Sequence, residues 1–185
     1  MKSDPPNEIL MESEWHYRRP AVTLHWLLAI LIVAQVALGI YMMSVEDDPG
    51  SERYFILHMS TGIMIGTLVL LRVAWRLTHK PARLPRSVAR WEVRATHMVQ
   101  WLLYACMLAM PVTGYLGASF SREGVVLFGL PLSAWASSNK ELSEEFFSIH
   151  MMIAVVLVAL VGLHVLGALK HLLIDKDRVF QRMWY

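Results

Sequence analysis

The feature that most constrains this chain is a set of four long apolar segments, each about the length of a membrane-spanning helix. A helix rises ~1.5 Å per residue, so about 20 apolar residues cross the hydrocarbon core of a bilayer. Lipid offers no hydrogen-bond partner to an open backbone, so helices are the expected structure of such segments. The segments cover residues 21–44, 54–77, 95–118 and 146–174.

Composition favours a membrane protein over a soluble helical bundle, which is the alternative for helices of this kind. Apolar residues make up 56% of the 185 residues, which is above the roughly one half of an average soluble domain. The first 20 residues are polar and mixed in charge, and we expect no cleaved signal peptide. We predict an all-α membrane protein, a four-transmembrane-helix bundle that forms a single domain over residues 1–185.

Lys and Arg are distributed unevenly between the two sides of the predicted bundle. Only Arg53, Arg122 and Lys140 lie on one side, and the other 14 of the 17 lie near the termini and the 78–94 connection. The positive-inside rule therefore places both termini and the 78–94 loop in the cytoplasm, and the 119–143 loop outside. We expect the basic face to contact lipid headgroups rather than nucleic acid. The outer loops carry eight acidic residues: Glu46, Asp47, Asp48, Glu52, Glu123, Glu141, Glu144 and Glu145.

Four histidines lie inside the apolar segments at two matched depths. His25 and His164 lie toward the cytoplasmic side, and His58 and His150 lie toward the outer side. An ionisable residue inside a membrane helix suggests function by default. His150 and His164 are 14 residues apart, which is ~21 Å along a helix and about 40° short of four full turns. They share one helix face, so we predict two layers, each with two imidazoles from different helices.

Two imidazoles that face each other across a gap are what a six-coordinate haem iron needs, because the porphyrin supplies the other four nitrogens. The chain has no C-x-x-C-H motif, so we expect b-type haem without thioether bonds. Zinc is the rival metal, but it prefers a third or fourth nearby ligand. The single Cys106 lies in the middle of a segment, and no acidic residue lies inside any segment. Any one histidine taken alone could instead be a hydrogen-bonded packing residue.

Two glycines on the histidine faces would leave room for a flat macrocycle. Gly62 follows His58 by four residues on the same face, and Gly39 follows His25 by 14 and reaches the outer layer. Gly62 is also the first glycine of a G-x-x-x-G pattern, an ordinary helix contact in membranes. The sequence leaves both interpretations open.

Two further histidines lie near the cytoplasmic side. His97 is near the start of the third segment, where it could bond a haem propionate or simply sit at the membrane interface. His171 continues the face of His164 about 10 Å further along, too far to bind the same iron. An imidazole there could hydrogen-bond a quinone carbonyl and pass a proton at neutral pH, or serve as an interfacial anchor.

These motifs resemble the bacterial cytochrome b561 family, the small four-helix di-haem proteins of the inner membrane. The resemblance covers about Arg19 to Lys176. The stretches that carry it are TLHWLLA around His25, LHMSTG around His58, RVAWR at the end of the second segment, His97 with Tyr104 and MPVTG at 110–114, and then His150, His164 and His171.

The resemblance implies two haem b groups and electron transfer between a periplasmic donor and membrane quinone. Similarity to a superoxide oxidase of the family implies that superoxide is the donor and ubiquinone the acceptor, with His171 as the catalytic residue beside quinone. Arg53, Arg122 or Lys140 would guide superoxide, although the acidic outer loops suit a cationic redox protein better.

Two other classes of function stay open. Related histidine patterns occur in the cytochrome b subunits of hydrogenases and formate dehydrogenases, so the chain could be an anchor subunit for a dehydrogenase or cytochrome c partner. A non-redox metal transporter is the third alternative.

Overall fold

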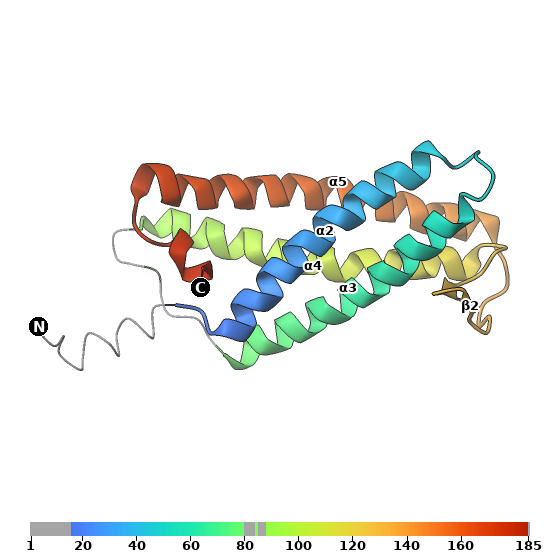
Figure 1. Cartoon of the computed structure of the whole chain (residues 1–185), viewed down its shortest axis with the longest axis horizontal. Coiled ribbons are helices and arrows are strands. Elements are labelled where there is room, and N and C mark those ends of the chain that lie inside the picture. Colours follow the sequence, from blue (N-terminus) through green and yellow to red (C-terminus); the bar gives the residue numbers. More distant parts are fainter. Residues whose placement is uncertain (1–15, 80–83, 85–87, 185) are drawn as a thin grey trace, which may run out of the picture.

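Four long helices form an elongated bundle in the computed structural model, which describes residues 16–79, 84 and 88–184 (Figure 1). All four are long and apolar enough to cross a membrane, and the predicted all-α, four-helix membrane fold is confirmed. All four helices begin two to six residues before the predicted segments, because backbone hydrogen bonding continues into the polar ends. The helices are α2 (Arg19–Ser44), α3 (Glu52–Thr78), α4 (Arg90–Phe120) and α5 (Lys140–Lys170).

Local signals explain where α2 and α5 begin and how the chain ends. Pro20 lies in the first turn of α2, where a missing N–H is tolerated. The Asn139 side chain caps α5 by accepting from the Leu142 amide at 3.2 Å. A π-helical turn, η1 (His171–Asp175), and a 3₁₀ turn, η2 (Phe180–Met183), follow α5.

The C-terminal turn folds back onto the start of α2 (Figure 1). The indole N–H of Trp26 donates to the backbone oxygen of Met183 at 2.7 Å. The Tyr17 amide donates to the backbone oxygen of Arg182 at 3.2 Å. The two ends of the described chain therefore meet at the same end of the bundle.

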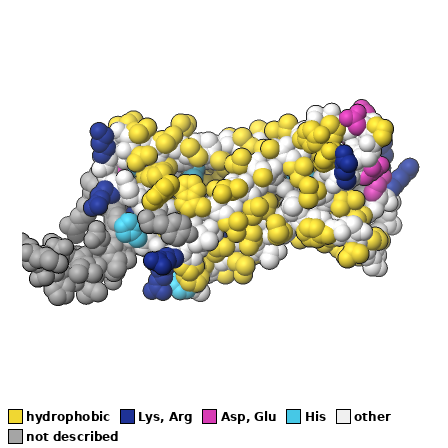
Figure 2. All heavy atoms as spheres, in the orientation of Figure 1, with side chains coloured by type: hydrophobic (Ala, Val, Ile, Leu, Met, Phe, Trp, Pro, Cys, Tyr) yellow, Lys and Arg dark blue, Asp and Glu magenta, His cyan; other side chains and the backbone are white. Residues whose placement is uncertain are grey.

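The outside of the bundle is apolar along most of its length (Figure 2). Ile30, Val155 and Ile174 are among many large apolar side chains that are more than 60% exposed. Their exposure is expected of a protein whose solvent is lipid. On the face in view, acidic side chains lie beside Lys and Arg side chains at the end of the bundle that carries the 121–139 connection, and Lys, Arg and His side chains lie at the opposite end. The interior is limited to small clusters around Leu28, Ile65 and Val69, and around Val99, Leu103 and Leu157.

Glycines allow close approach between helices at two points. A Cβ added to Gly66 of α3 would lie 2.8 Å from the ring of Pro111, which lies inside α4. A Cβ on Gly117 of α4 would lie 2.8 Å from the ring of Phe147 in α5. Gly66, the second glycine of the G-x-x-x-G pattern, therefore serves a helix contact of the kind common in membranes.

The connection between α4 and α5 contains a small hairpin, made of β1 (Val126–Leu127) and β2 (Leu130–Pro131). Its two turn residues, Phe128 and Gly129, both have positive φ, as the tight turns preferred by hairpins require. The Phe128 amide donates to the Ser60 hydroxyl at 2.8 Å and so joins the hairpin to α3. The outer connection thus packs against the bundle.

Candidate functional site

The first histidine pair joins His25 of α2 with His164 of α5. Their ring centres are 6.1 Å apart, and the ring planes are inclined at 77°. Both residues are half-buried. The Trp26 ring packs beside His25 with its centre 5.4 Å away. The structure brings together the two histidines that the sequence assigned to the inner layer.

The second pair joins His58 of α3 with His150 of α5. Their ring centres are 6.2 Å apart, and the planes are inclined at 73°. Both of these histidines are also half-buried. One helix, α5, therefore contributes an imidazole to each pair, while α2 and α3 contribute one each.

The separation within each pair suits a metal ion between the rings. Metal–nitrogen bonds of about 2 Å on both sides place the centres of two imidazoles that share an iron roughly 6 Å apart. Two imidazoles joined directly by a hydrogen bond of about 2.9 Å would have centres only roughly 5 Å apart. Both observed separations, 6.1 and 6.2 Å, match the first arrangement.

The hydrogen bonds of the outer pair also fit haem ligation. Nδ1 of His150 lies 3.0 Å from the backbone oxygen of Met110 and 3.2 Å from the Thr113 hydroxyl. A carbonyl only accepts, so Nδ1 carries the proton and Nε2 keeps the lone pair that a metal needs. Nδ1 of His58 is buried and has no hydrogen-bond partner among the described residues, and a buried nitrogen left without a partner costs about 1–3 kcal/mol.

Two glycines lie directly against the outer rings. A Cβ on Gly39 would lie 3.2 Å from Cε1 of His58, and a Cβ on Gly114 would lie 3.2 Å from Cε1 of His150. Gly39 thus reaches the outer layer, as its spacing predicted. Gly114 was missed as a site residue, although it ends the MPVTG stretch. A Cβ on Gly62 would instead lie 3.1 Å from Nε2 of Gln35.

Gln35 fixes the backbone next to His58. Its Nε2 donates to the backbone oxygen of His58 at 2.7 Å, and its Oε1 accepts from the Thr61 hydroxyl at 2.7 Å. Polar side chains commonly join helices in membranes in this way. An amide within an otherwise apolar segment was the signal that could have identified this residue.

Arg72 of α3 lies at the inner pair. Its Nη1 donates to the backbone oxygen of Ala21 at 2.7 Å, and its Nη2 lies 3.4 Å from Nδ1 of His25. In the sequence, Arg72 is part of the RVAWR stretch that carries the family resemblance. Arg72 was also counted among the basic residues near the 78–94 connection, but its position six residues before the end of α3 was itself a signal of function.

His97 is exposed on α4 and belongs to neither pair. A contact between His97 and a haem propionate therefore stays a prediction.

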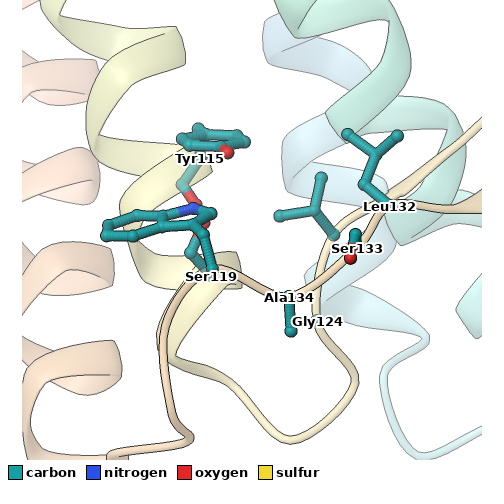
Figure 3. A pocket seen from close by; sticks show the side chains of 8 residues that line it. Tyr115, Ser119, Gly124, Leu132, Ser133 and Ala134 are labelled. Carbon is teal, nitrogen blue, oxygen red and sulfur yellow. The ribbon is translucent and has the colours of Figure 1, made fainter.

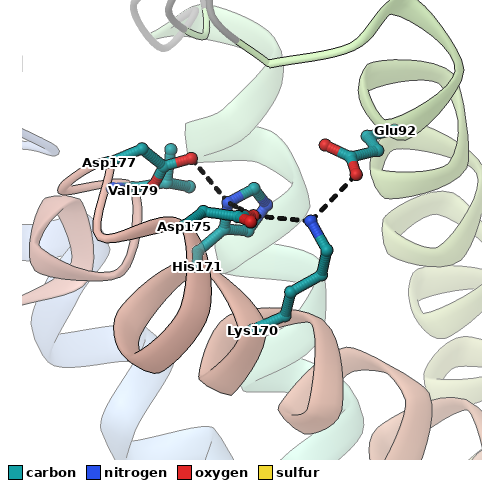
Figure 4. Close-up of polar contacts among 6 residues, drawn as sticks. All are labelled: Glu92, Lys170, His171, Asp175, Asp177 and Val179. Atoms are coloured by element: carbon teal, nitrogen blue, oxygen red, sulfur yellow. Dashed lines mark hydrogen bonds and ion pairs between the residues drawn. The ribbon is translucent and has the colours of Figure 1, made fainter.

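His171 lies in a hydrogen-bonded network where α5 ends (Figure 4). Its Nδ1 is 2.7 Å from the Asp177 carboxylate and 3.4 Å from that of Asp175. Lys170 bridges Asp175 at 2.5 Å and Glu92 of α4 at 2.9 Å. Two ligands of a tetrahedral zinc ion would lie roughly 3.3 Å apart, so the 2.7 Å contact fits a charge-assisted hydrogen bond better than shared metal ligation.

A small cavity lies at the end of the bundle that carries the 121–139 connection (Figure 3). Its volume is about 30 Å³, and its lining includes Tyr115, Ser119 and Trp135. The rings of Tyr115 and Trp135 stack at 6.5 Å. A space of this size holds one or two water-sized molecules and is far too small for a quinone.

Comparison with known proteins finds membrane cytochromes that are similar to this chain over most of its length. The family model described as prokaryotic cytochrome b561 matches residues 16–185. Cytochrome b561 homolog 2 of Escherichia coli (strain K12) is 30% identical over 168 residues, which are 88% of each chain. Probable superoxide oxidase CybB of Yersinia pestis is 25% identical over 167 residues, 88% of this chain and 92% of that protein. Cytochrome b562 of Cereibacter sphaeroides is 26% identical over 179 residues, 94% of this chain and 98% of that protein.

The histidine pairs inside a four-helix membrane bundle and the match over nearly the whole described chain agree. This protein belongs to the prokaryotic cytochrome b561 family, whose members are multi-pass membrane cytochromes b that bind haem and transfer electrons.

Proposed function

We propose that the protein holds two haem b groups in a bacterial inner membrane and passes electrons from a periplasmic donor to membrane quinone. The observation that carries this proposal is the presence of two imidazole pairs, with ring centres 6.1 and 6.2 Å apart, at two depths along α5. Both termini lie in the cytoplasm in this proposal, as the distribution of Lys and Arg predicts.

His25 and His164 would hold the inner haem iron, and His58 and His150 the outer one. Bound iron supplies one-electron exchange between its ferrous and ferric states. The chain itself orients the ligands: the Met110 oxygen fixes the ring of His150, and Gln35 holds the backbone of His58. The apolar helices exclude water from both layers.

His171 would contact quinone at the cytoplasmic end of α5. Its side chain is 12% exposed, and its Nδ1 is bonded to the Asp177 carboxylate. Nε2 is therefore the nitrogen left for a substrate. A nitrogen donates to a quinone carbonyl only when it carries a proton, and the carboxylates of Asp175 and Asp177 lie beside Nδ1 of the same ring. Quinone reduction consumes two protons, which a residue at this interface can supply from water.

Superoxide is the donor suggested by the name of the Yersinia pestis relative. Three basic residues of the outer side were expected to guide it. Arg53 stacks over the Tyr54 ring at 4.8 Å, and Lys140 pairs with Glu144 at 3.5 Å. Arg122 is exposed. All three lie at the protein surface, where they could meet a small anion.

A cationic redox protein is the second candidate donor. The predicted outer loops carry eight acidic and three basic residues, and acidic side chains are visible beside basic ones at the end of the bundle that carries the 121–139 connection (Figure 2). A negative surface attracts a positively charged partner and repels an anion such as superoxide. This observation favours an anchor or relay role for a peripheral partner.

A reduced-minus-oxidised spectrum of purified protein, followed by stopped-flow mixing, tests the proposal. Superoxide should reduce the haems, and added ubiquinone should then reoxidise them. Reduction by a basic cytochrome c but not by superoxide would favour the second candidate. A colourless protein that takes up no haem would overturn both.

A further inference from the structure

We propose that Arg72 binds a carboxylate of the inner haem and holds this haem at a higher potential than the outer one, so that electrons pass from the outer pair to the inner pair. This inference rests on the proposed two-haem function. It assigns a binding role to a charged residue inside the membrane and gives a direction to electron transfer.

Arg72 is a cation inside the bundle without a described counter-ion. Its guanidinium is always charged and carries five N–H donors. Its hydrogen-bonding contacts are the Ala21 backbone oxygen and Nδ1 of His25, both uncharged acceptors. Among the residues that the structure describes, none of the ion pairs between basic and acidic side chains includes Arg72. A charge in a membrane helix pairs with another charge or with backbone carbonyls, and the Ala21 oxygen occupies only one of the five guanidinium donors.

Haem binding would remove one of these two contacts. An imidazole that binds iron through Nε2 while neutral carries its proton on Nδ1. Nδ1 of His25 could then no longer accept a hydrogen bond from Arg72 Nη2, which now lies 3.4 Å away. The guanidinium would need a new acceptor at the same depth as the iron ligand. Haem b would bind at that depth, and its two propionate carboxylates can accept hydrogen bonds from the guanidinium.

An arginine suits this acceptor better than a lysine would. Its planar fork can donate two parallel hydrogen bonds to one carboxylate. The anchoring bond from Nη1 to the Ala21 oxygen, at 2.7 Å, joins α3 to the start of α2. That bond would hold the guanidinium in place while Nη2 changes partner.

The outer pair has no comparable charge among its described contacts. His150 bonds to the Met110 oxygen and the Thr113 hydroxyl, and the backbone of His58 bonds to the amide of Gln35. These groups are all neutral. A nearby positive charge stabilises reduced iron over oxidised iron, because the reduced centre carries one positive charge less. The inner haem is therefore the better electron acceptor of the two.

Redox titration of the purified holoprotein tests the inference, with absorbance and electron paramagnetic resonance resolving the two components. Arg72→Gln should lower the midpoint potential of the inner component and leave the outer one unchanged. Arg72→Lys keeps the positive charge but loses the planar guanidinium, so it should lower that potential less than Arg72→Gln does. Arg76→Gln is the matched control, since Arg76 lies one turn away on α3 and bonds Tyr17 and Gln100. An Arg72→Gln shift that is absent, upward, or no larger than that of Arg76→Gln would overturn the inference.

A second measurement covers the case in which Arg72→Gln loses the inner haem. Haem-free parent protein is reconstituted with haem dimethyl ester, in which both carboxylates are blocked. The inner component should then titrate at a lower potential than with haem b, and the outer component should shift less. Equal shifts of both components, or none, would show that Arg72 does not act through a carboxylate. A parent protein that binds fewer than two haems would instead defeat the proposed function itself.

Discussion

Nδ1 of His150 lies 3.0 Å from the backbone oxygen of Met110, the residue immediately before the proline inside α4. Pro111 has no N–H, so the hydrogen-bond ladder of α4 loses the bond to the Met107 oxygen, about one turn before Met110. The orientation of the His150 ring is thus set by a main-chain atom of a neighbouring helix. A backbone acceptor also fixes the tautomer, which leaves Nε2 for the gap shared with His58.

Two non-covalent haems per chain should be found in the purified protein. The reasons are the two imidazole pairs of matching separation and the absence of an attachment motif. A pyridine haemochrome assay against protein concentration counts the haems, and extraction with acidified acetone should remove both. A ratio of one or zero would contradict the two-layer arrangement.

The pairing of ligands can be read from single substitutions. His25→Ala or His164→Ala should remove the inner spectral component, and His58→Ala or His150→Ala the outer one. Each substitution deletes one axial ligand and leaves the other pair intact. Low-temperature difference spectra and electron paramagnetic resonance separate the components. Loss of the same component from His25→Ala and His58→Ala would show that the assignment by depth is wrong.

Gly114→Ala should disturb the outer haem alone. The new methyl group would lie 3.2 Å from the His150 ring, so the ring must move by a few tenths of an ångström. Gly162→Ala on α5 is the matched control, because nothing lies within 4 Å of a Cβ at that position. We expect a shifted or weakened outer component in the first variant and a parent-like spectrum in the second. Identical spectra from both variants would show that Gly114 is not needed for the ring position.

Both termini should be found in the cytoplasm. The start of α2 and the C-terminal turn lie at one end of the bundle, so a single reporter orients the whole chain. A C-terminal fusion should be active with green fluorescent protein and inactive with alkaline phosphatase. An active phosphatase fusion would reverse the orientation and exchange the roles of the two haems.

His171→Ala should keep both haems and slow quinone reduction about a hundredfold, the lower range for loss of a general acid. Asp177→Asn keeps an oxygen that can accept from Nδ1 but removes the charge, so its effect should be smaller. Stopped-flow reoxidation of prereduced protein by ubiquinone measures both rates. If His171→Ala reoxidises at the parent rate, His171 is an interfacial anchor and the quinone site lies elsewhere.

The sequence predicted the histidine pairs because the spacing within one helix follows from its rise and turn. The 14-residue interval between His150 and His164 determines both their depth and their shared face. Contacts between helices were harder to predict from the sequence. Helices surrounded by lipid are apolar on nearly all sides, so the pattern does not show which way each helix faces. Gln35, Arg72 and Gly114 were missed as site residues for this reason.

The end of α5 illustrates a second limit. The sequence placed His171 on the face of His164 by assuming regular helix geometry. The structure forms a π-helical turn from His171 to Asp175, and Lys176 then adopts a positive φ of 50°. This change of direction brings Asp177 against His171, a contact that no regular period predicts.

Because α5 supplies one histidine to each pair, it sets the distance between the two proposed haem sites. Electron tunnelling rates fall steeply with distance, and here one rigid helix sets that distance. A bend in α2 or α3 alters one layer, whereas a bend in α5 alters both together. One residue inserted between His150 and His164 would turn one ligand by about 100° relative to the other. The number of residues between His150 and His164 is therefore fixed more strictly than the identity of the apolar residues around them.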